Sequence, residues 1–279
     1  MGWITTHPTR GTRVIAVTRD IGDAEEAAAP MIITGERTVP GIWHENYWFR
    51  RHEVVYSAVT ALVADRVVLE AGCGEGYGAA LLAEQARVVH ALDYDDYAVT
   101  HVRRTYPRLP VVRANLVELP LANTTYDVVI SLQTIEHLWD QRAFVAECVR
   151  VLRPGGVLVI STPNTLTFPP GNVYHPNELA ASELRDLVSE HADIDDLVGL
   201  HHGAGLARWE AEHGSLVDAQ IATSYESWPP HLTERVTSVT TDDFELRSGD
   251  MNDLDDLDDL DVGLDLVLVA RRRPEATGG

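Results

Sequence analysis

Residues that could perform acid–base chemistry gather in one short segment and a later loop. Glu136 and His137 are adjacent, Gln133 precedes Glu136 by three residues, and His175 lies in a loop rich in proline and asparagine. The spacing of 133, 136 and 137 is that of one face of a helix. A histidine can take a proton from a hydroxyl group, and a glutamate with two histidines can instead hold a divalent cation. We therefore predict Glu136, His137 and His175 as catalytic residues and as the candidate metal ligands.

A second informative run, residues 70–78, combines a strand end, an acid and a glycine-rich loop. An apolar run at 67–69 predicts a buried parallel strand, and residues 79–85 predict a helix, so the loop lies where open α/β sheets bind ligands. Gly74, Gly76 and Ala79 complete a dinucleotide fingerprint, so NAD stays open by pattern alone. The Glu70 carboxylate, however, would repel a pyrophosphate, whereas it can accept hydrogen bonds from an ammonium group.

Two further strand ends carry polar residues suited to a nucleoside. Asp93 and Tyr94 follow the predicted strand 88–92, and Asp93 comes 23 residues after Glu70. An acid at this place can bind ribose hydroxyls, with capping of the next helix as the alternative. Asn115 and Leu116 follow the predicted strand 111–114. The amide oxygen of Asn115 can accept a hydrogen bond from an adenine amino group.

Two strings, LEAGCGEGYG and LRPGGVLVISTPN, resemble motifs of the class I S-adenosylmethionine (SAM) dependent methyltransferases. The resemblance implies SAM as the cofactor and a Rossmann-like α/β fold. Class members commonly have aspartate where this chain has Asn115, so that contact would lack charge assistance. The implied cofactor-binding residues lie in the loop and at the strand ends: Glu70, Ala71, Gly72, Cys73, Gly74, Tyr77, Asp93, Tyr94, Asn115, Leu116 and Gln133.

Strings outside these motifs resemble actinobacterial sugar O-methyltransferases of polymethylated polysaccharides, of the methylglucose lipopolysaccharide type. They span about residues 34–272 and include GERTVP, ENYWFRRHEVVY, IEHLWDQ and VTTDDFEL. The resemblance implies a helix covering the methionine end of SAM, with Arg51 as a carboxylate clamp. The alternative is that the aromatic residues of this helix are core and its arginines are solvated.

The chain departs from the related families at two places. Metal-dependent O-methyltransferases of quinones and small RNAs carry Glu-x-x-Glu-His, but Gln133 replaces the first glutamate here, which removes a charged ligand for Mg²⁺. A strand-end contact with the cofactor is the other role for Gln133. The sugar enzymes tend to have a longer loop reading NPFH, which is shortened here to NVYHPNE. The acceptor and the position methylated therefore stay open.

The elements that must position these residues form one α/β unit. We predict a mostly parallel seven-stranded sheet with an antiparallel edge strand and helices on both faces, its closing strands near 243–247 and 264–270 forming an antiparallel pair. The predicted organisation comprises a mobile tail at 1–30, a helical lead-in at 31–66, a SAM-binding core at 67–165, a substrate loop and cap at 166–240, closing strands with a solvated acidic loop (252–261) at 241–273, and a tail at 274–279.

Composition narrows the class of partner. The net charge is −21 and all 22 basic residues are arginine, so the field of the protein opposes binding to nucleic acid or anionic membrane. No apolar run is long enough for a membrane span, and no signal peptide is readable. Cys73 and Cys148 are too few for a disulfide framework. We expect a cytoplasmic protein with a small-molecule or oligosaccharide acceptor, and a homodimer is compatible with the sequence.

The function predicted from these patterns is SAM-dependent O-methylation of a hydroxyl on a sugar or short oligosaccharide. A quinone, a polyketide or an RNA end is the alternative acceptor. The non-enzymatic alternative is a regulatory subunit that retains the methyltransferase fold, with Asn115 and Gln133 as signs of decay.

Overall fold

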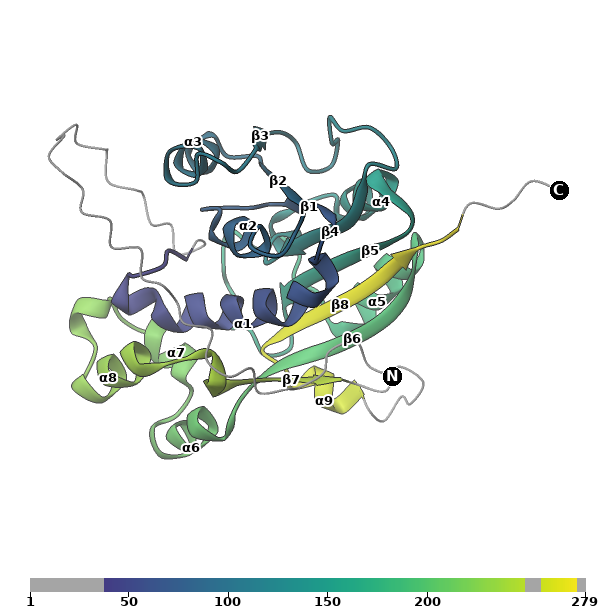
Figure 1. Ribbon diagram of the computed structural model, residues 1–279. Coiled ribbons are helices and arrows are strands. Elements are labelled where there is room, and N and C mark those ends of the chain that lie inside the picture. The colour runs from purple at the N-terminus through teal and green to yellow at the C-terminus, as the bar shows by residue number, and fades with distance from the viewer. Residues whose placement is uncertain (1–37, 249–256, 275–279) are drawn as a thin grey trace, which may run out of the picture.

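The computed structural model describes residues 38–248 and 257–274 (Figure 1). The predicted tail at 1–30 and the start of the lead-in lie outside these residues, as do most of the tail at 274–279 and the first half of the predicted acidic loop. The second half of that loop, from 257, forms a short helix, α9 (Leu257–Asp261). Within the described part of the chain, no helix is both long and apolar enough to cross a membrane.

A single sheet forms the centre of the described structure, with strand order β3-β2-β1-β4-β5-β8-β6-β7. The first five strands in the chain run parallel, β8 runs antiparallel to both β5 and β6, and β7 runs antiparallel to β6. Among the described residues the strands are β1 (Val67–Ala71), β2 (Val88–Asp93), β3 (Val111–Arg113), β4 (Tyr126–Leu132), β5 (Leu152–Pro163), β6 (Ala192–His202), β7 (Phe244–Ser248) and β8 (Asp265–Arg272).

The prediction of seven strands with one antiparallel edge strand was wrong in detail. The eight strands of the described chain include β6, which the prediction missed, and β6 separates β7 from β8, the two strands expected to pair with each other. The acids at 193, 195 and 196 interrupt the apolar pattern of β6 at its start, where the strand also carries a bulge. Its uncharged run, residues 197–200, is too short to identify a strand from periodicity alone.

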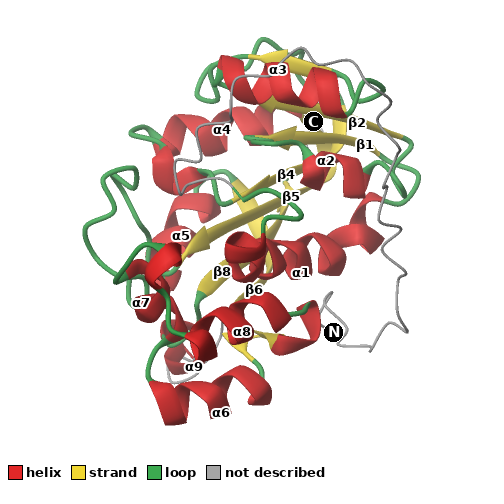
Figure 2. Cartoon of the chain, turned by 90° about the vertical axis from the view of Figure 1, so that its left-hand side faces the viewer, coloured by secondary structure: helices red, strands yellow, loops and turns green. Residues whose placement is uncertain are grey.

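Helices cover both faces of the sheet, as predicted (Figures 1 and 2). One hydrophobic core joins the sheet to α1 (Asn46–Val63), α2 (Tyr77–Leu82), α3 (Asp96–Thr105), α6 (Ala204–His213), α7 (Leu216–Ile221) and α8 (Pro230–Ser238). The core on the opposite face is formed with α4 (Gln141–Val151), α5 (Ala181–Ser189) and α9. Short 3-10 turns occur at η1 (Trp43–Glu45), η2 (Ile135–His137), η3 (Tyr225–Ser227) and η4 (Thr241–Asp243).

The strand order places a crevice between β1 and β4. The chain runs outward from β1 to β2 and β3, then returns to the other side of β1 with β4 and β5. At such a reversal the loops leaving the two central strands turn in opposite directions, and open α/β sheets bind ligands there. The glycine loop after β1 and the turn after β4 therefore lie side by side. Both predicted sets of chemically active residues are at this edge.

Candidate active site

The glycine loop after β1 depends on close backbone approach to the turn after β4. Gly72 has a φ of +86°, and a Cβ added there would lie 2.4 Å from the Thr134 side chain. Its amide and that of Cys73 both donate to the carbonyl of Leu92 at the end of β2, at 2.8 and 3.0 Å. Only glycine combines this backbone conformation with this contact. The loop is thus fixed against β2 and β4 before α2 begins at Tyr77.

Glu70 lies at the end of β1 and is completely buried. Its Oε1 accepts a hydrogen bond of 2.5 Å from the Tyr56 hydroxyl on α1, and this ring packs so closely on Gly78 that a Cβ there would lie 2.1 Å from it. Burial raises the pKa of the Glu70 carboxyl to about 8, an effect that the Tyr56 bond partly offsets. Its Oε2 is buried and has no hydrogen-bond donor of normal geometry among the described residues, although the Ala79 amide is near enough to lower this pKa. A cofactor ammonium would supply such a donor, so this position fits SAM.

Asp93 ends β2 beside the glycine loop. Its Oδ2 accepts a hydrogen bond from the Gly74 amide at 2.8 Å, and its Oδ1 accepts one from the Asp95 amide at 2.9 Å. Each carboxylate oxygen has a second lone pair that a ribose hydroxyl can use. A Cβ added to Gly74 would meet no atom within 4 Å, so the loop faces open space there. The geometry therefore leaves room for a ligand next to the predicted ribose-binding acid.

The other predicted cofactor residues differ in exposure. Tyr94 and Asn115 are exposed at the ends of β2 and β3, whereas Leu116 is buried. Ala71 and Cys73 are also buried, and burial raises the pKa of the Cys73 thiol. The exposed residues can thus contact a ligand through their side chains. Ala71, Cys73 and Leu116 shape the loop and the core beneath it.

Tyr77, at the start of α2, connects the glycine loop to the lead-in segment. Its hydroxyl lies 3.1 Å from Oγ1 of Thr38 and 3.1 Å from Nδ1 of His52. Desolvation lowers the pKa of the His52 imidazole to about 4, so this ring is neutral at physiological pH. The three groups form a polar triangle between the lead-in, α1 and α2. The lead-in is therefore bonded to the start of α2, and its covering of the cofactor cleft stays a prediction.

Arg51, the predicted carboxylate clamp, already holds a carboxylate of the chain. Its Nε and Nη2 donate to the two oxygens of Asp265 at 2.6 Å each, and Nη2 also donates to the carbonyl of Leu264 at 2.8 Å. The side chain is only 2% exposed. This ion pair joins α1 to β8, a structural role that the sequence pattern did not indicate. Contact with the SAM carboxylate stays a prediction.

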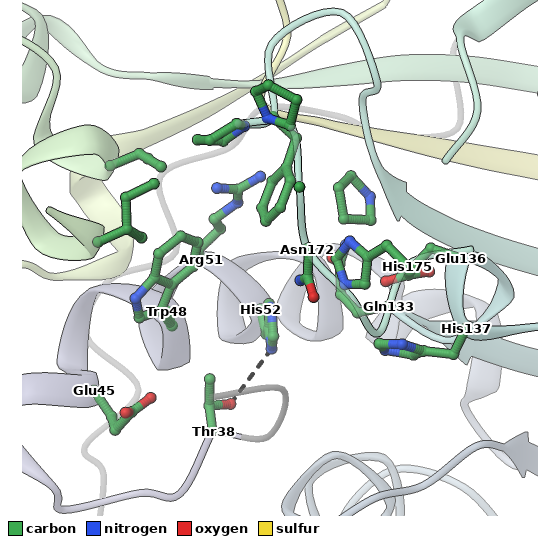
Figure 3. A pocket seen from close by; sticks show the side chains of 17 residues that line it. Thr38, Glu45, Trp48, Arg51, His52, Gln133, Glu136, His137, Asn172 and His175 are labelled. Atoms are coloured by element: carbon green, nitrogen blue, oxygen red, sulfur yellow. Dashed lines mark hydrogen bonds between the residues drawn. The ribbon is translucent and has the colours of Figure 1, made fainter. Parts of the chain in front are cut away.

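The turn after β4 brings the predicted catalytic residues together. One potential ligand atom from each of Glu136, His137 and His175 lies within 4.8 Å of the others, and the two imidazole centroids are 4.9 Å apart. The expected helical face is absent from this turn, because η2 is a 3-10 turn and Gln133 has a φ of +50°. Gln133 instead donates from Nε2 to Oγ of Ser161 at 3.2 Å. It therefore lies at the strand ends, where it lines the same cavity as the cluster (Figure 3).

Hydrogen bonds define the proton positions of both histidines. Nδ1 of His137 lies 2.9 Å from the carbonyl oxygen of Tyr174, which can only accept, so this nitrogen carries the proton. Nδ1 of His175 lies 2.8 Å from Oε1 of Glu178, and a carboxylate likewise accepts. In the neutral tautomer each ring therefore has its lone pair on Nε2. That nitrogen can take a proton or bind a cation.

Glu136 is the buried member of the cluster, at 1% exposure. Its Oε2 accepts a hydrogen bond from Oγ1 of Thr162 at 3.3 Å. Burial raises the pKa of its carboxyl to about 8, while the charge of His175 and the Thr162 bond act in the opposite direction. Neither Thr162 nor Tyr56 was predicted as a site residue. A hydroxyl at the end of β5 was the available signal for Thr162.

A cavity of about 400 Å³ borders this cluster. Figure 3 shows Glu136, His137 and His175 on one side of it and Glu45 and Trp48 on the other. Prediction missed several of its walls, because aromatic and proline residues read as ordinary core or loop residues. These are Trp48, Pro163, Phe168, Pro169 and Pro170, with Thr38, Glu45, His52 and Asn172 as polar members.

Comparison with known proteins agrees with this geometry. Residues 69–160 match the family model described as a methyltransferase domain. A protein of Mycolicibacterium smegmatis, named a probable S-adenosylmethionine-dependent methyltransferase, is 50% identical over 262 residues, covering 90% of this chain and 100% of that protein. A relative with the same description in Mycobacterium tuberculosis H37Rv is 50% identical over 254 residues, covering 88% of this chain and 90% of that one.

A solved structure shows the same fold. The crystal structure of a SAM-dependent methyltransferase from Thermotoga maritima superposes with a TM-score of 0.56 at 15% sequence identity, covering 83% of this chain and 92% of that chain. The matches at 50% identity carry more than the fold, because they cover 90% and 88% of this chain. The chain belongs to the family of S-adenosylmethionine-dependent methyltransferases.

Proposed function

We propose that this methyltransferase transfers the methyl group to a hydroxyl oxygen of a sugar or short oligosaccharide. The observation that carries the proposal is the meeting of Glu136, His137 and His175 at the wall of the cavity, beside the ends of β4 and β5. SAM, when bound, supplies a methyl group on a positively charged sulfur. A sugar hydroxyl is a weak acid and a weak nucleophile, so an oxygen acceptor needs a base nearby, whereas a neutral amine attacks through its lone pair without first losing a proton.

His175 is the proposed base. With its Nδ1–H donating to Glu178, its Nε2 lone pair can take the hydroxyl proton, and the carboxylate then stabilises the imidazolium that forms. The pair is shielded from water, since the side chains of His175 and Glu178 are 6% and 14% exposed. His137, held by the Tyr174 carbonyl, orients the acceptor from the neighbouring position.

The same three residues are also the proposed ligands of a divalent cation. Mg²⁺, the ion considered from the sequence, prefers oxygen ligands, but this set offers one carboxylate and two imidazoles. Such a set suits an ion that prefers imidazole ligands, such as Zn²⁺ or Fe²⁺, better. Chelation followed by addition of single ions separates the two roles. Activity that survives chelation supports His175 as a base, and activity restored by one ion supports a ligand role.

The shape of the cavity supports a sugar acceptor. Trp48, Phe168 and the prolines at 163, 169 and 170 provide flat apolar walls, while Glu45, His52 and Asn172 provide hydrogen-bonding groups. Pyranose rings have both kinds of surface, with C–H groups on their faces and hydroxyls around their edges. The net charge of −21 further favours an uncharged acceptor over a nucleic acid.

The test is methyl transfer from isotopically labelled SAM to a panel of acceptors, read by mass spectrometry. The panel contains glucose and mannose oligosaccharides, phenols and quinols, long-chain alcohols and RNA 3′ ends. Transfer to the sugars, with little to the others, is the expected result. Transfer only to another class would replace the acceptor. Binding of S-adenosylhomocysteine without turnover on any class would favour the regulatory alternative.

A further inference from the structure

A cluster of aromatic rings lies next to the cavity mouth on the cap side and takes no part in the proposed chemistry. Tyr225 and Trp228, in and just after η3, meet Trp43 and His44 of η1. The His44 and Tyr225 rings are stacked, with centroids 3.8 Å apart and planes 2° from parallel. Trp43 and Tyr225 are nevertheless 41% and 39% exposed. We call these four residues the aromatic platform.

The platform continues from the cavity. Glu45, which lines the cavity, is two residues from Trp43 in the same 3-10 turn. On the other segment Ile221 lines the cavity while being 57% exposed, so the cavity opens to solvent there, four residues before Tyr225. Figure 3 places Glu45 on the side of the cavity opposite the histidine cluster. A ligand leading away from the cluster past Glu45 would therefore meet the platform.

The platform is held rigidly although its two segments are about 180 residues apart in the chain. Asn46, next to η1, donates from Nδ2 to the carbonyls of Val236 and Val239 at 2.9 Å each, which ties η1 to the end of α8. The indole N–H of Trp228 donates to the carbonyl of Thr223 at 3.2 Å. A ligand would thus find these rings already in place, which reduces the entropy lost on binding.

Ring geometry and charge indicate the class of ligand. Trp43 meets Tyr225 and Trp228 edge to face, with centroids 5.8 and 6.1 Å apart, so the rings fill the space between themselves and leave no cage for a cation. They present outward ring surface instead. The Glu45 and Glu226 carboxylates flank this surface and can accept hydrogen bonds from hydroxyl groups, whereas they would repel an anionic ligand.

We infer that the aromatic platform is a second sugar subsite, which binds residues of an oligosaccharide beyond the one that is methylated. The inference rests on the proposed function, because it takes the sugar chain to start at the histidine cluster. Pyranose C–H groups pack on the negative faces of aromatic rings, and the neighbouring hydroxyls reach the carboxylates. The platform therefore makes the enzyme prefer oligosaccharide acceptors over monosaccharides.

The test compares acceptors of different length in variants of the platform. Trp43→Ala with Tyr225→Ala is expected to raise KM for a glucose or mannose octasaccharide by about tenfold, with KM for the methyl monosaccharide unchanged. Trp43→Phe with Tyr225→Phe keeps the rings and is expected to keep the low KM. Tyr97→Ala, which removes a 78% exposed aromatic ring from α3, is the matched control.

Direct binding separates this inference from the proposed function. Calorimetric titration of the octasaccharides into protein saturated with S-adenosylhomocysteine measures the platform without turnover. Binding that the double alanine variant loses, with no methyl transfer to any sugar, would support the platform and overturn the function. Transfer to sugars with equal octasaccharide KM in wild type and double variant would overturn the platform. The inference would also be overturned if the double alanine variant changed from dimer to monomer while its octasaccharide affinity stayed the same. The rings would then form a contact between two copies of the chain.

Discussion

Two buried glutamates, each with a carboxyl pKa raised to about 8 by burial, mark two regions of the site that are built differently. Around Glu70 the cofactor region is made by residues close in sequence: Tyr56 is 14 positions away, and Gly74 and Asp93 are 19 apart. Around Glu136 the acceptor region needs the loop that carries His175, with His137 and Tyr174 separated by 37 positions.

Because of this difference, the two regions tolerate different amounts of change in sequence. The cofactor region is locked by the glycine backbone, where Gly72 and Gly78 leave no room for a Cβ. The acceptor region depends on one loop between β5 and α5, whose length and sequence can vary without disturbing the sheet. Cofactor binding and acceptor chemistry should therefore respond independently to mutation, and the predictions below test this independence.

The largest expected effect is on the acceptor side. His175→Ala should lower kcat by about 10²- to 10⁴-fold, because it removes the proposed base, and should leave S-adenosylhomocysteine affinity within about twofold. Steady-state kinetics and calorimetry measure the two quantities. His213→Ala, at an exposed histidine of α6, is the control. A parallel fall in cofactor affinity would show that the two regions are coupled.

The ion pair between Arg51 and Asp265 lies at the cavity wall, and its loss should mainly lower the free energy of unfolding. Asp265→Ala leaves a buried guanidinium without its counter-charge, which is expected to cost about 3–5 kcal/mol of unfolding free energy. Asp193→Ala removes the exposed pair with Arg273 and should cost less than about 1 kcal/mol. Urea unfolding compares the variants. Equal losses of unfolding free energy in the two variants would mean that water or another group compensates the charge of Arg51 when Asp265 is absent.

The ionisation of Glu70 should make the stability of the fold depend on pH. Its pKa is 4.5 in the ordinary state and about 8 in the fold, so between these values the folded chain keeps a proton that the unfolded chain has lost. Stability must then fall as pH rises, by up to roughly 1.4 kcal/mol per pH unit. Glu70→Gln has no such proton. The free energy of unfolding of Glu70→Gln should therefore rise relative to that of wild type from about pH 5 to pH 8. If the two free energies change in parallel with pH, the pKa of Glu70 is not raised in the folded chain.

The smallest expected effect concerns the ribose contact. Asp93→Asn keeps one hydrogen-bond acceptor for the Gly74 amide but loses the charge, so KM for SAM should rise about tenfold with kcat nearly unchanged. Asp96→Asn changes an exposed acid at the start of α3 and serves as the control. A lower kcat at saturating SAM would place Asp93 in the acceptor chemistry as well.

Short-range patterns in the sequence predicted the strands, loop and helix around Glu70. The glycine loop follows β1, Asp93 ends β2, and helices cover both faces, because strand ends and glycine turns are local features. The grouping of Glu136, His137 and His175 was also predicted, although the helical spacing behind it was wrong.

Contacts between residues far apart in the chain could not be predicted from the sequence. Arg51 and Asp265 are 214 positions apart, and no pattern in either segment identifies the other as its partner. The position of β6 between β8 and β7 depends on which edges meet after folding, and its early acids conceal the strand. Likewise, the aromatic platform joins two segments about 180 residues apart, and the cap segment has no periodicity that could identify its partner. Periodicity reports which face of an element is buried, but it does not report the partner that buries it.

The ion pair between Arg51 and Asp265 also has a consequence for synthesis of the chain. Asp265 lies on β8, the last strand in the chain, which forms hydrogen bonds with both β5 and β6. A growing chain that has emerged only through β5 can form the glycine loop, yet its Arg51 has no carboxylate to meet. The part of the cavity wall that Arg51 lines is thus completed last, when Asp265 has been synthesised.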